Sequence, residues 1–382
     1  MPTSDAATST NATAPAKSHY VILDGLRGVA SLLVIVFHLF EAYAGNDPQR
    51  QIINHGYLAV DFFFLLSGFV IAYAYDDRWA CMGQWEFYKR RLVRLQPMVM
   101  LGSVIGAALF VFQDWTIFPK VAGSSAWQVI FVMLIGCTMI PLPKSADIRG
   151  WDETYPLNGP AWSLFYEYCA NVLYAIGLRR LSNRGLGALV GLSAVALVVL
   201  LVAGGRGDLI GGWSLDAGSL TMGFTRVMFP FFAGMLLKRL GKRIRLPGAF
   251  WLCSLMLIVA LSLPRFGGTG RLWVNGLYEA GCVIVLFPLI VAIGAGEKRI
   301  DGPSVRVARF FGDLSYPLYI THYPLMYIYT GWVIDRKIPP LQGALAGLGV
   351  FIVAVALAYA SFKLFDEPVR RWLASKLLTR PT

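Results

Sequence analysis

The sequence predicts an all-α polytopic membrane protein with about ten transmembrane helices and one short re-entrant or interfacial segment. Of the 382 residues, 56% are hydrophobic and only 15% are charged, whereas a soluble chain carries about a quarter charged residues. The mean hydropathy is +0.57. Eleven apolar runs follow one another along the chain, and most reach the ~17 to 25 residues that a membrane-spanning helix needs.

The loops between these runs are mostly short, and Lys and Arg gather in some of them. Such an excess marks loops that stay in the cytoplasm, which predicts that both termini lie inside and that the number of spans is even. Segment 127–140 is below the spanning minimum of ~17 residues, so we expect it to be re-entrant or interfacial, with segment 97–113 as the alternative. The apolar runs lie at 20–41, 57–75, 97–113, 127–140, 160–178, 185–203, 220–237, 248–263, 272–295, 310–332 and 341–364.

We expect one membrane domain over residues 19–372, with a disordered cytoplasmic tail at 1–18 and a second cytoplasmic tail at 373–382. The net charge of +12 is explained by the basic loops and the lipid bilayer they face, so we expect no nucleic-acid partner. The five cysteines form no CxxC pair, and the four histidines show no recurrent ligand spacing. These patterns favour no metal site.

The first apolar run, Leu23 to Glu41, carries ionisable residues that are costly inside a membrane and therefore mark a candidate functional site. Arg27 and His38 are 38 − 27 = 11 residues apart, which is about three helical turns. They therefore share one face, about 16 Å apart along the axis. Glu41 follows His38 at i+3 and lies on the same face.

Asp61 lies near the start of the second apolar run, at a depth that we expect to match His38 and Glu41. A carboxylate beside an imidazole fixes its tautomer and raises its basicity, as a general base requires. The alternative is that Glu41 and Asp61 are interfacial groups in water. Ser67 and Gly68 are typical of helix packing and not of a nucleophile.

Arg91 and Arg94 lie at i and i+3 in the basic loop before the third run, so they share a helix face. Two guanidiniums on one face suit a phosphate or a diphosphate, because each binds anionic oxygens in pairs. The alternative is that these residues only orient the chain in the membrane.

Two later apolar runs carry further polar residues, which we expect to line a pore between the helices together with the residues above. Ser163 and Glu167 share a face at i and i+4, and Glu167 lies about two turns into an apolar run. Ser315 and His322 are seven apart and share a face as well, although a single buried histidine is more often structural. The predicted pore-lining residues are Trp162, Ser163, Glu167, Ser315, Tyr316 and His322.

Six short motifs carry a family resemblance. They are LDGLRG with Arg27 and His38, YLAVDFFFLLSGF, FYKRRLVRLQP, PAWSLFYE, SYPLYITHYP and DEPVRRW. In this order along one polytopic chain they resemble the acyltransferase-3 family of integral membrane acyltransferases, over roughly residues 19 to 372. The chain departs from the family at Ala59, where glycine is usual, and at Tyr168 and Cys169, where a second acidic residue is missing.

The resemblance implies a bacterial plasma-membrane enzyme that moves an acyl group, with acetyl favoured, from cytoplasmic acyl-CoA to a hydroxyl of a sugar, polysaccharide or glycoside. It implies that His38 is the catalytic base, oriented by Glu41 or Asp61. Arg27, Arg91 and Arg94 would bind the acyl-CoA. Direct transfer is favoured over an acyl-enzyme, because no Ser or Cys stands at a matching position beside His38.

The resemblance also bears on partners. No hydrolase-like domain follows the membrane domain, so a second transfer would need a separate extracytoplasmic transferase; a homo-oligomer is the other partner left open. An alternative function of a different class is that of a proton-coupled transporter or flippase, in which Arg, His and Glu form a proton relay. The absence of a visible internal repeat counts against it.

Overall fold

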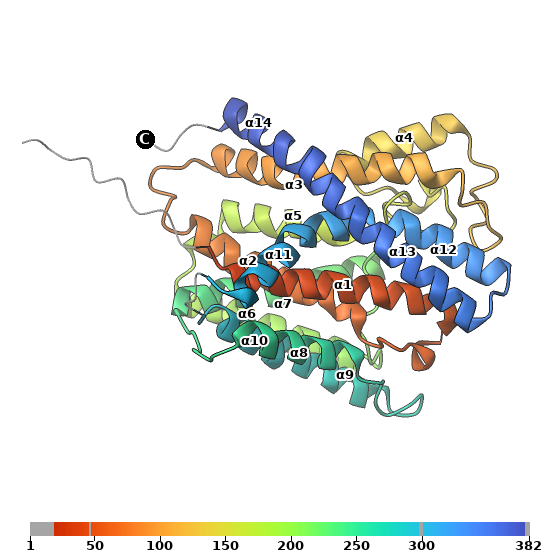
Figure 1. Cartoon of the computed structure of the whole chain (residues 1–382). Helices are drawn as coiled ribbons and strands as arrows, with labels where there is room; N and C mark the ends of the chain where they lie inside the picture. Colours follow the sequence, from red (N-terminus) through yellow and green to blue (C-terminus); the bar gives the residue numbers. More distant parts are fainter. Residues whose placement is uncertain (1–18, 46, 298–300, 379–382) are drawn as a thin grey trace, which may run out of the picture.

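The computed structural model describes residues 19–45, 47–297 and 301–378. Over these residues the chain is helical and contains no strand, which confirms the predicted all-α fold. Figure 1 shows the helices lying side by side in an elongated bundle. The predicted tail at 1–18 lies outside the described residues.

Fourteen α-helices and several short helical turns make up the described chain. The α-helices are α1 Val21–Ala44, α2 Ala59–Tyr75, α3 Gln84–Phe110, α4 Ala126–Gly136, α5 Ala161–Ile176, α6 Asn183–Val198, α7 Ala217–Leu240, α8 Ala249–Ser262, α9 Leu272–Gly281, α10 Phe287–Gly294, α11 Pro303–Thr321, α12 Tyr323–Asp335, α13 Pro340–Ser361 and α14 Glu367–Leu377. Turns of π-helix at Val199–Ala203, Cys282–Leu286 and Phe362–Asp366 extend α6, join α9 to α10 and join α13 to α14. Turns of 3₁₀-helix lie at Pro48–Arg50, Gly56–Leu58, Lys144–Ala146 and Leu178–Arg180.

Helix lengths separate the spanning segments from the shorter ones. Within the described ranges, seven helical stretches are long and apolar enough to cross a membrane. The 11 residues of α4 cover only about 16 Å, against ~30 Å of hydrocarbon, whereas α3 has 27 residues. The short segment is therefore α4, and the remaining helices are compatible with the ten predicted spans.

The central helix α1 packs closely along α11. A side chain at Gly28 would collide with the backbone of α11, because a Cβ built there lies 2.2 Å from the Phe311 carbonyl oxygen. The missing side chain lets the two backbones approach. Further along, Ser31 Oγ donates to the Ser315 carbonyl oxygen at 3.1 Å. The polar residues of α1 and α11 are thereby held against one another.

A second close pair, α2 and α7, is built from small residues on both sides. A Cβ at Gly68 would lie 1.8 Å from the Phe231 carbonyl oxygen, and a Cβ at Gly234 would lie 2.1 Å from the Leu65 carbonyl oxygen. Gly68 thus has the packing role that the sequence predicts, as is common where membrane helices approach closely.

The predicted run 310–332 is not one helix. It divides at His322 into α11 and α12, because Pro324 has no N–H to donate to the Ile320 carbonyl. Asn158 Nδ2 donates to that free carbonyl at 2.9 Å instead. His322 therefore lies at a helix junction, which corrects its expected mid-helix position.

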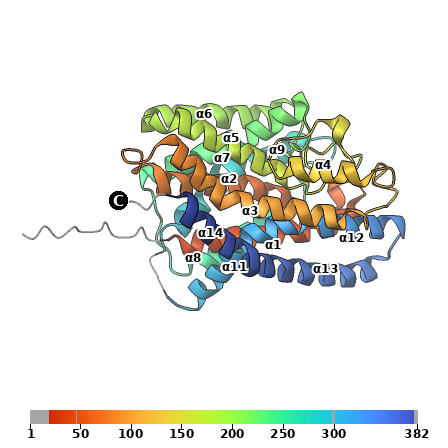
Figure 2. The ribbon, with the colours of Figure 1, turned by 90° about the horizontal axis from the view of Figure 1, so that it is seen from above.

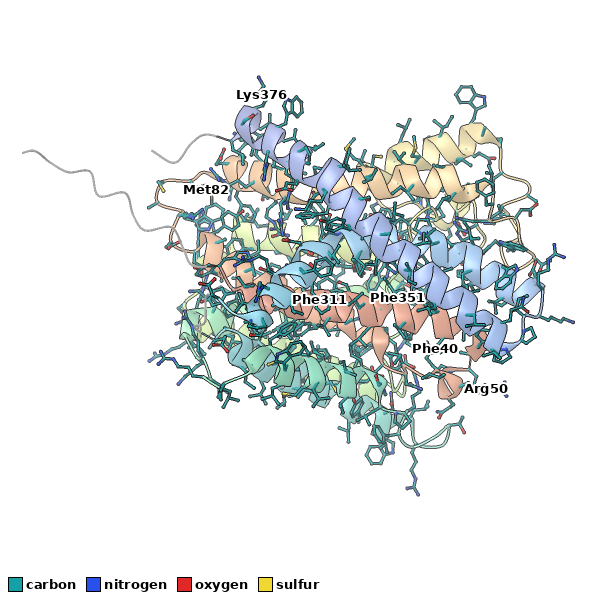
Figure 3. All side chains as sticks on the ribbon, in the orientation of Figure 1. Phe40, Arg50, Met82, Phe311, Phe351 and Lys376 are labelled. Carbon is teal, nitrogen blue, oxygen red and sulfur yellow. The ribbon has the colours of Figure 1, made fainter. Side chains whose placement is uncertain are left out.

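The loops rich in Lys and Arg, which the sequence predicts to be cytoplasmic, come together at one end of the bundle. Arg239, at the end of α7, pairs with Asp76 after α2 at 2.7 Å and donates to the Arg179 carbonyl at 2.8 Å. We call this the basic end. Figures 1 and 2 show that α1 begins and α14 ends there, and Figure 3 places Lys376 at this end and Phe40 at the other.

The long segment between α3 and α5, at the opposite end, is ordered around a buried arginine. Arg149 donates to Gln113 Oε1 and to the Pro156 carbonyl, both at 2.7 Å, and its guanidinium lies 3.3 Å from the ring centre of Tyr327. Tyr327 in turn donates to Glu153 Oε2 at 2.5 Å. These contacts anchor the loop that leads into α5.

A second buried network joins three other loops at this end. His55 contacts the Leu263 carbonyl at 2.9 Å and Asn275 Oδ1 at 3.0 Å. Glu279 accepts from Tyr57, from Asn275 and from the backbone of residue 209. Each of these buried groups has a partner, as stability inside a protein requires.

Gly68→Ala should destabilise the protein, because its Cβ has no room against the α7 backbone. Overpacking of this kind costs ~1 to 3 kcal/mol, so we expect a lower thermal midpoint in detergent. Gly187→Ala is the matched control, since nothing lies within 4 Å of a Cβ at that helical position. Equal midpoints for the two variants would contradict the tight α2–α7 packing.

Stability should depend on pH through Glu153. Burial is the largest cause that raises the pKa of this carboxyl from 4.5 to about 7; Arg149 opposes the rise, while Asp147 and Glu41 reinforce it. Between these values the folded protein holds a proton that the unfolded chain lacks. The free energy of unfolding should therefore fall as the pH rises from about 4.5 to 7, by at most about 3 kcal/mol.

Glu153→Gln removes this titration, so its thermal midpoint should gain on that of the wild type as the pH rises through this window. The measurement is the midpoint of both proteins in nanodiscs between pH 4.5 and 8. Midpoints that stay parallel across the window would show that Glu153 does not titrate there.

Candidate functional site

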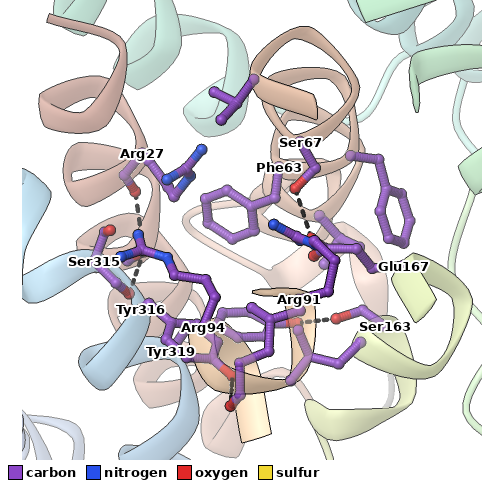
Figure 4. Close-up of a pocket in the computed structure, with 16 residues that line it drawn as sticks. Arg27, Phe63, Ser67, Arg91, Arg94, Ser163, Glu167, Ser315, Tyr316 and Tyr319 are labelled. Carbon is purple, nitrogen blue, oxygen red and sulfur yellow. Dashed lines mark hydrogen bonds and ion pairs between the residues drawn. The ribbon is translucent and has the colours of Figure 1, made fainter. Parts of the chain in front are cut away.

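A cavity of about 100 Å³ lies among α1, α2, α3, α5 and α11. Figure 4 shows its lining, with arginines entering from α1 and α3 and Glu167 from α5. The structure therefore brings together most of the predicted site. The predicted residues that line it are Arg27, Arg91, Arg94, Ser163, Glu167, Ser315 and Tyr316.

Arg91 and Glu167 form an ion pair across the cavity. Arg91 Nη2 lies 2.9 Å from Glu167 Oε1, and Ser67 Oγ donates to the same oxygen at 2.9 Å. The Nε of Arg91 is buried and has no hydrogen-bond partner. A buried donor without a partner is costly, so the cavity can accept an oxygen-bearing ligand at this point.

Arg27 and Arg94 add two more guanidiniums to the cavity. Arg27 pairs with Asp24 of its own helix at 3.1 Å. Arg94 is exposed, and among the described residues no carboxylate lies within ion-pair distance of it. The cavity therefore holds positive charge that its own carboxylates do not neutralise.

The two histidines of the predicted site lie against each other beyond the cavity. The rings of His38 and His322 stack with centroids 5.7 Å apart. His38 Nδ1 lies 2.8 Å from Glu41 Oε2, and because a carboxylate can only accept, Nδ1 carries the proton and Nε2 is left basic. Glu41, and not Asp61, is the carboxylate at this imidazole.

The second ring has the same tautomer. His322 Nδ1 donates toward the carbonyls of Leu318 and Tyr319, each at 3.0 Å. Its Nε2 is buried and has no partner. Two imidazoles thus present unprotonated nitrogens in one small region of the bundle.

Asp61 belongs to a different assembly. Arg226 of α7 binds its carboxylate through two nitrogens, at 2.7 and 3.2 Å, and both side chains are buried. Arg226 also donates to the Tyr57 carbonyl at 2.8 Å and lies 5.1 Å from the ring centre of Trp162. The structure therefore separates Asp61 and Trp162 from the cavity and the histidines, contrary to the predicted grouping.

Tyr319 lies between the cavity and the histidine pair. Its hydroxyl is 2.7 Å from Ser163 Oγ, its ring centre is 6.1 Å from that of His322, and it also lines the cavity. His38 follows the cavity-lining Ser31 by seven residues, about 10 Å along α1. The basic cavity and the histidines are therefore consecutive parts of one site along α1.

The sequence analysis did not identify two cavity-lining residues, Tyr319 and Ser67, or the partner of Asp61, Arg226. Tyr319 lies midway between Ser315 and His322, and the helical spacing puts all three on one face. The sequence could therefore have predicted that Tyr319 belongs to the site. Ser67 was predicted only to pack between helices. Arg226 is a single arginine in an apolar run, which is itself a sign of a buried partner.

Among the described residues, no group of three His, Cys, Asp or Glu side chains is arranged to hold a metal ion. The three guanidiniums that line the cavity suit an anionic ligand.

Comparison with known proteins gives a family and several relatives. A family model described as an acyltransferase domain matches residues 20–362. Protein 2 in the picA locus of Rhizobium radiobacter is 33% identical over 187 residues, which are 47% of this chain and 93% of that protein. O-acetyltransferase OatA of Staphylococcus aureus is 24% identical over 374 residues, 91% of this chain.

The chain spans 57% of the length of OatA. Acyltransferase MdmB of Streptomyces mycarofaciens is 29% identical over 163 residues, 41% of this chain and 38% of MdmB. No solved structure matches the chain.

The family match extends from the residue before α1 to the first residue of the π-helical turn that precedes α14. It therefore includes both the cavity and the histidine pair. The chain belongs to the acyltransferase-3 family of membrane acyltransferases.

Proposed function

We propose that the protein is a membrane O-acyltransferase that moves an acyl group, acetyl above all, from cytoplasmic acyl-CoA to a hydroxyl of a sugar, polysaccharide or glycoside. The observation that carries this proposal is the arrangement along α1. Arg27 faces a basic cavity, and the His38–Glu41 pair lies about 16 Å further along the same helix. The similarity to OatA, an O-acetyltransferase, and to MdmB, an acyltransferase, supports the same chemistry.

The basic cavity suits the donor. Acyl-CoA carries its phosphates at one end and its thioester at the other, joined by an extended pantetheine arm. Arg94, which has no carboxylate partner among the described residues, and the unpartnered Nε of Arg91 supply donors for phosphate oxygens. By the positive-inside rule, the basic end faces the cytoplasm, where acyl-CoA is found.

The histidine end suits the transfer itself. His38 Nε2 accepts the proton of the acceptor hydroxyl while that oxygen attacks the thioester carbonyl. The carbon–sulfur bond then breaks, and the imidazolium returns its proton to the thiolate, which leaves as free CoA. Glu41 stabilises the imidazolium through its 2.8 Å contact with Nδ1.

Direct transfer is the simpler course for this geometry. Within the described ranges, the hydrogen-bond partner of His38 is Glu41, and no serine or cysteine is placed against the imidazole as a nucleophile. Activation of such a nucleophile would require a hydrogen bond to the base. We therefore assign His38 the role of general base and Glu41 that of orienting the imidazole, in place of Asp61.

With envelope glycans supplied as acceptors, purified protein in nanodiscs should release free CoA from acetyl-CoA, and His38→Ala should lower this rate ~100-fold or more, because general-base catalysis contributes ~10² to 10⁴. Glu41→Gln should lower the rate less, since it leaves Nε2 in place. The release of free thiol measures both, with the thermal midpoint as the folding control. Full activity in a folded His38→Ala protein would remove His38 from the reaction.

A wild type that turns over neither acetyl-CoA nor longer acyl-CoAs, with envelope glycans present as acceptors, would overturn the proposal. Transport across proteoliposomes would then be the next measurement.

Arg94→Gln should weaken acetyl-CoA binding ~10-fold or more, because a hydrogen bond to a charged group contributes ~1.5 to 3 kcal/mol. Arg90→Gln is the matched control on the same helix, since Arg90 pairs with Glu86 at 2.8 Å and does not line the cavity. Titration calorimetry in nanodiscs measures both dissociation constants. An equal loss of affinity in the two variants would mean that this part of α3 acts only through its overall charge.

A further inference from the structure

The last helix reaches the mouth of the cavity. The stretch Pro340–Leu377 is one continuous helix of 38 residues, about 57 Å long, whereas the hydrocarbon layer is ~30 Å thick. A helix of this length can extend past the hydrocarbon layer, and its final part, α14, lies at the basic end of the bundle (Figure 1). There it packs on α3, and Lys89 Nζ donates to the Leu377 carbonyl at 3.1 Å.

Two adjacent arginines of α14 have different surroundings. Arg370 is 24% exposed, and its Nε lies 3.4 Å from Asp366 Oδ2. Its helix packs on α3, which carries Arg94, and Phe365, five residues earlier, packs against the same hydrophobic cluster as the cavity-lining Tyr316. Arg371 is 77% exposed and pairs with Glu367 at 2.5 Å. Arg370 is therefore partly buried on a helix that packs on α3, whereas Arg371 faces solvent.

The carboxylate beside Arg370 leaves most of its guanidinium available. A separation of 3.4 Å is long for a charged hydrogen bond, and the other oxygen of Asp366 is buried with no partner. Arg370 has five N–H donors in a fixed planar fork, and the Asp366 contact occupies one nitrogen. The remaining donors are available to a ligand on the side of α14 that packs against α3, the helix of Arg91 and Arg94.

We propose that Arg370 binds the 3′-phosphate of the CoA donor while Arg94 binds its diphosphate; this inference rests on the proposed use of acyl-CoA. The pantetheine arm runs inward from the diphosphate toward His38, so the ribose and its 3′-phosphate must lie outward, at the rim. Arg370 is a partly exposed guanidinium there, on the helix that packs against α3 and its Arg94. A phosphate monoester carries about −1.5 to −2 charges at neutral pH and suits a planar guanidinium.

The test compares two donors and three proteins. The dissociation constants of acetyl-CoA and acetyl-3′-dephospho-CoA are measured by titration calorimetry in nanodiscs for the wild type, Arg370→Gln and Arg371→Gln. The wild type should bind acetyl-CoA ~10-fold more tightly than the dephospho donor. Arg370→Gln should bind the two donors alike, and Arg371→Gln should keep the wild-type preference.

Two results would overturn the assignment: a wild type that binds both donors equally, or an Arg370→Gln protein that keeps the full preference. The wild-type comparison needs no variant, so it decides the matter even if Arg370→Gln fails to fold. Release of CoA from acetyl-CoA by the wild type separates the two proposals. If the wild type turns over acetyl-CoA but shows no preference for the 3′-phosphate, only the role of Arg370 is contradicted. If it neither binds nor turns over acyl-CoA, the proposed function is contradicted as well.

Discussion

The close packing of α1 against α11 sets the geometry of everything else in the site. Gly28 leaves no side chain between the two backbones, and Ser31 is hydrogen-bonded to the backbone of α11 at Ser315. Because the helices approach so closely, the polar faces of both point into the same narrow region. The cavity lies at the basic end of this seam, and the stacked rings of His38 and His322 lie at the other.

The polar and charged groups discussed above fall into two sets. Arg226 binds Asp61 and joins α7 to α2, while Arg149 binds Gln113 and the Pro156 carbonyl and orders the loop before α5, although its Nη1 is buried without a partner. Arg94 and the Nε2 of His322 do not have such partners among the described residues. Unpaired polar groups are costly in a folded protein. Those at the cavity and at the histidine pair are available to a ligand, whereas the Arg226–Asp61 pair joins helices.

The sequence was most informative where one helix carried the whole signal. Helical periodicity placed Arg27, His38 and Glu41 on one face without knowledge of any neighbour, and the length of α4 alone marked it as too short to span. Asp61 was misplaced because its partner, Arg226, lies 165 positions away in the chain. The break at His322 depends on Asn158, which caps the carbonyl that Pro324 leaves free. Contacts between distant segments cannot be read from periodicity.

The spacing of Arg27 and His38 on one α-helix has a consequence for how such a site can diverge. A helix is inextensible, so the separation between the two groups is set by residue count and not by how the bundle packs. Inserting one residue between them would lengthen the gap by only ~1.5 Å but would turn the imidazole by about 100° away from its face. The distance between donor end and base can therefore change only in steps of whole helical repeats. A family member that needs a different distance between the two groups must therefore use a different ligand or tilt the helix, because the spacing along the helix stays the same.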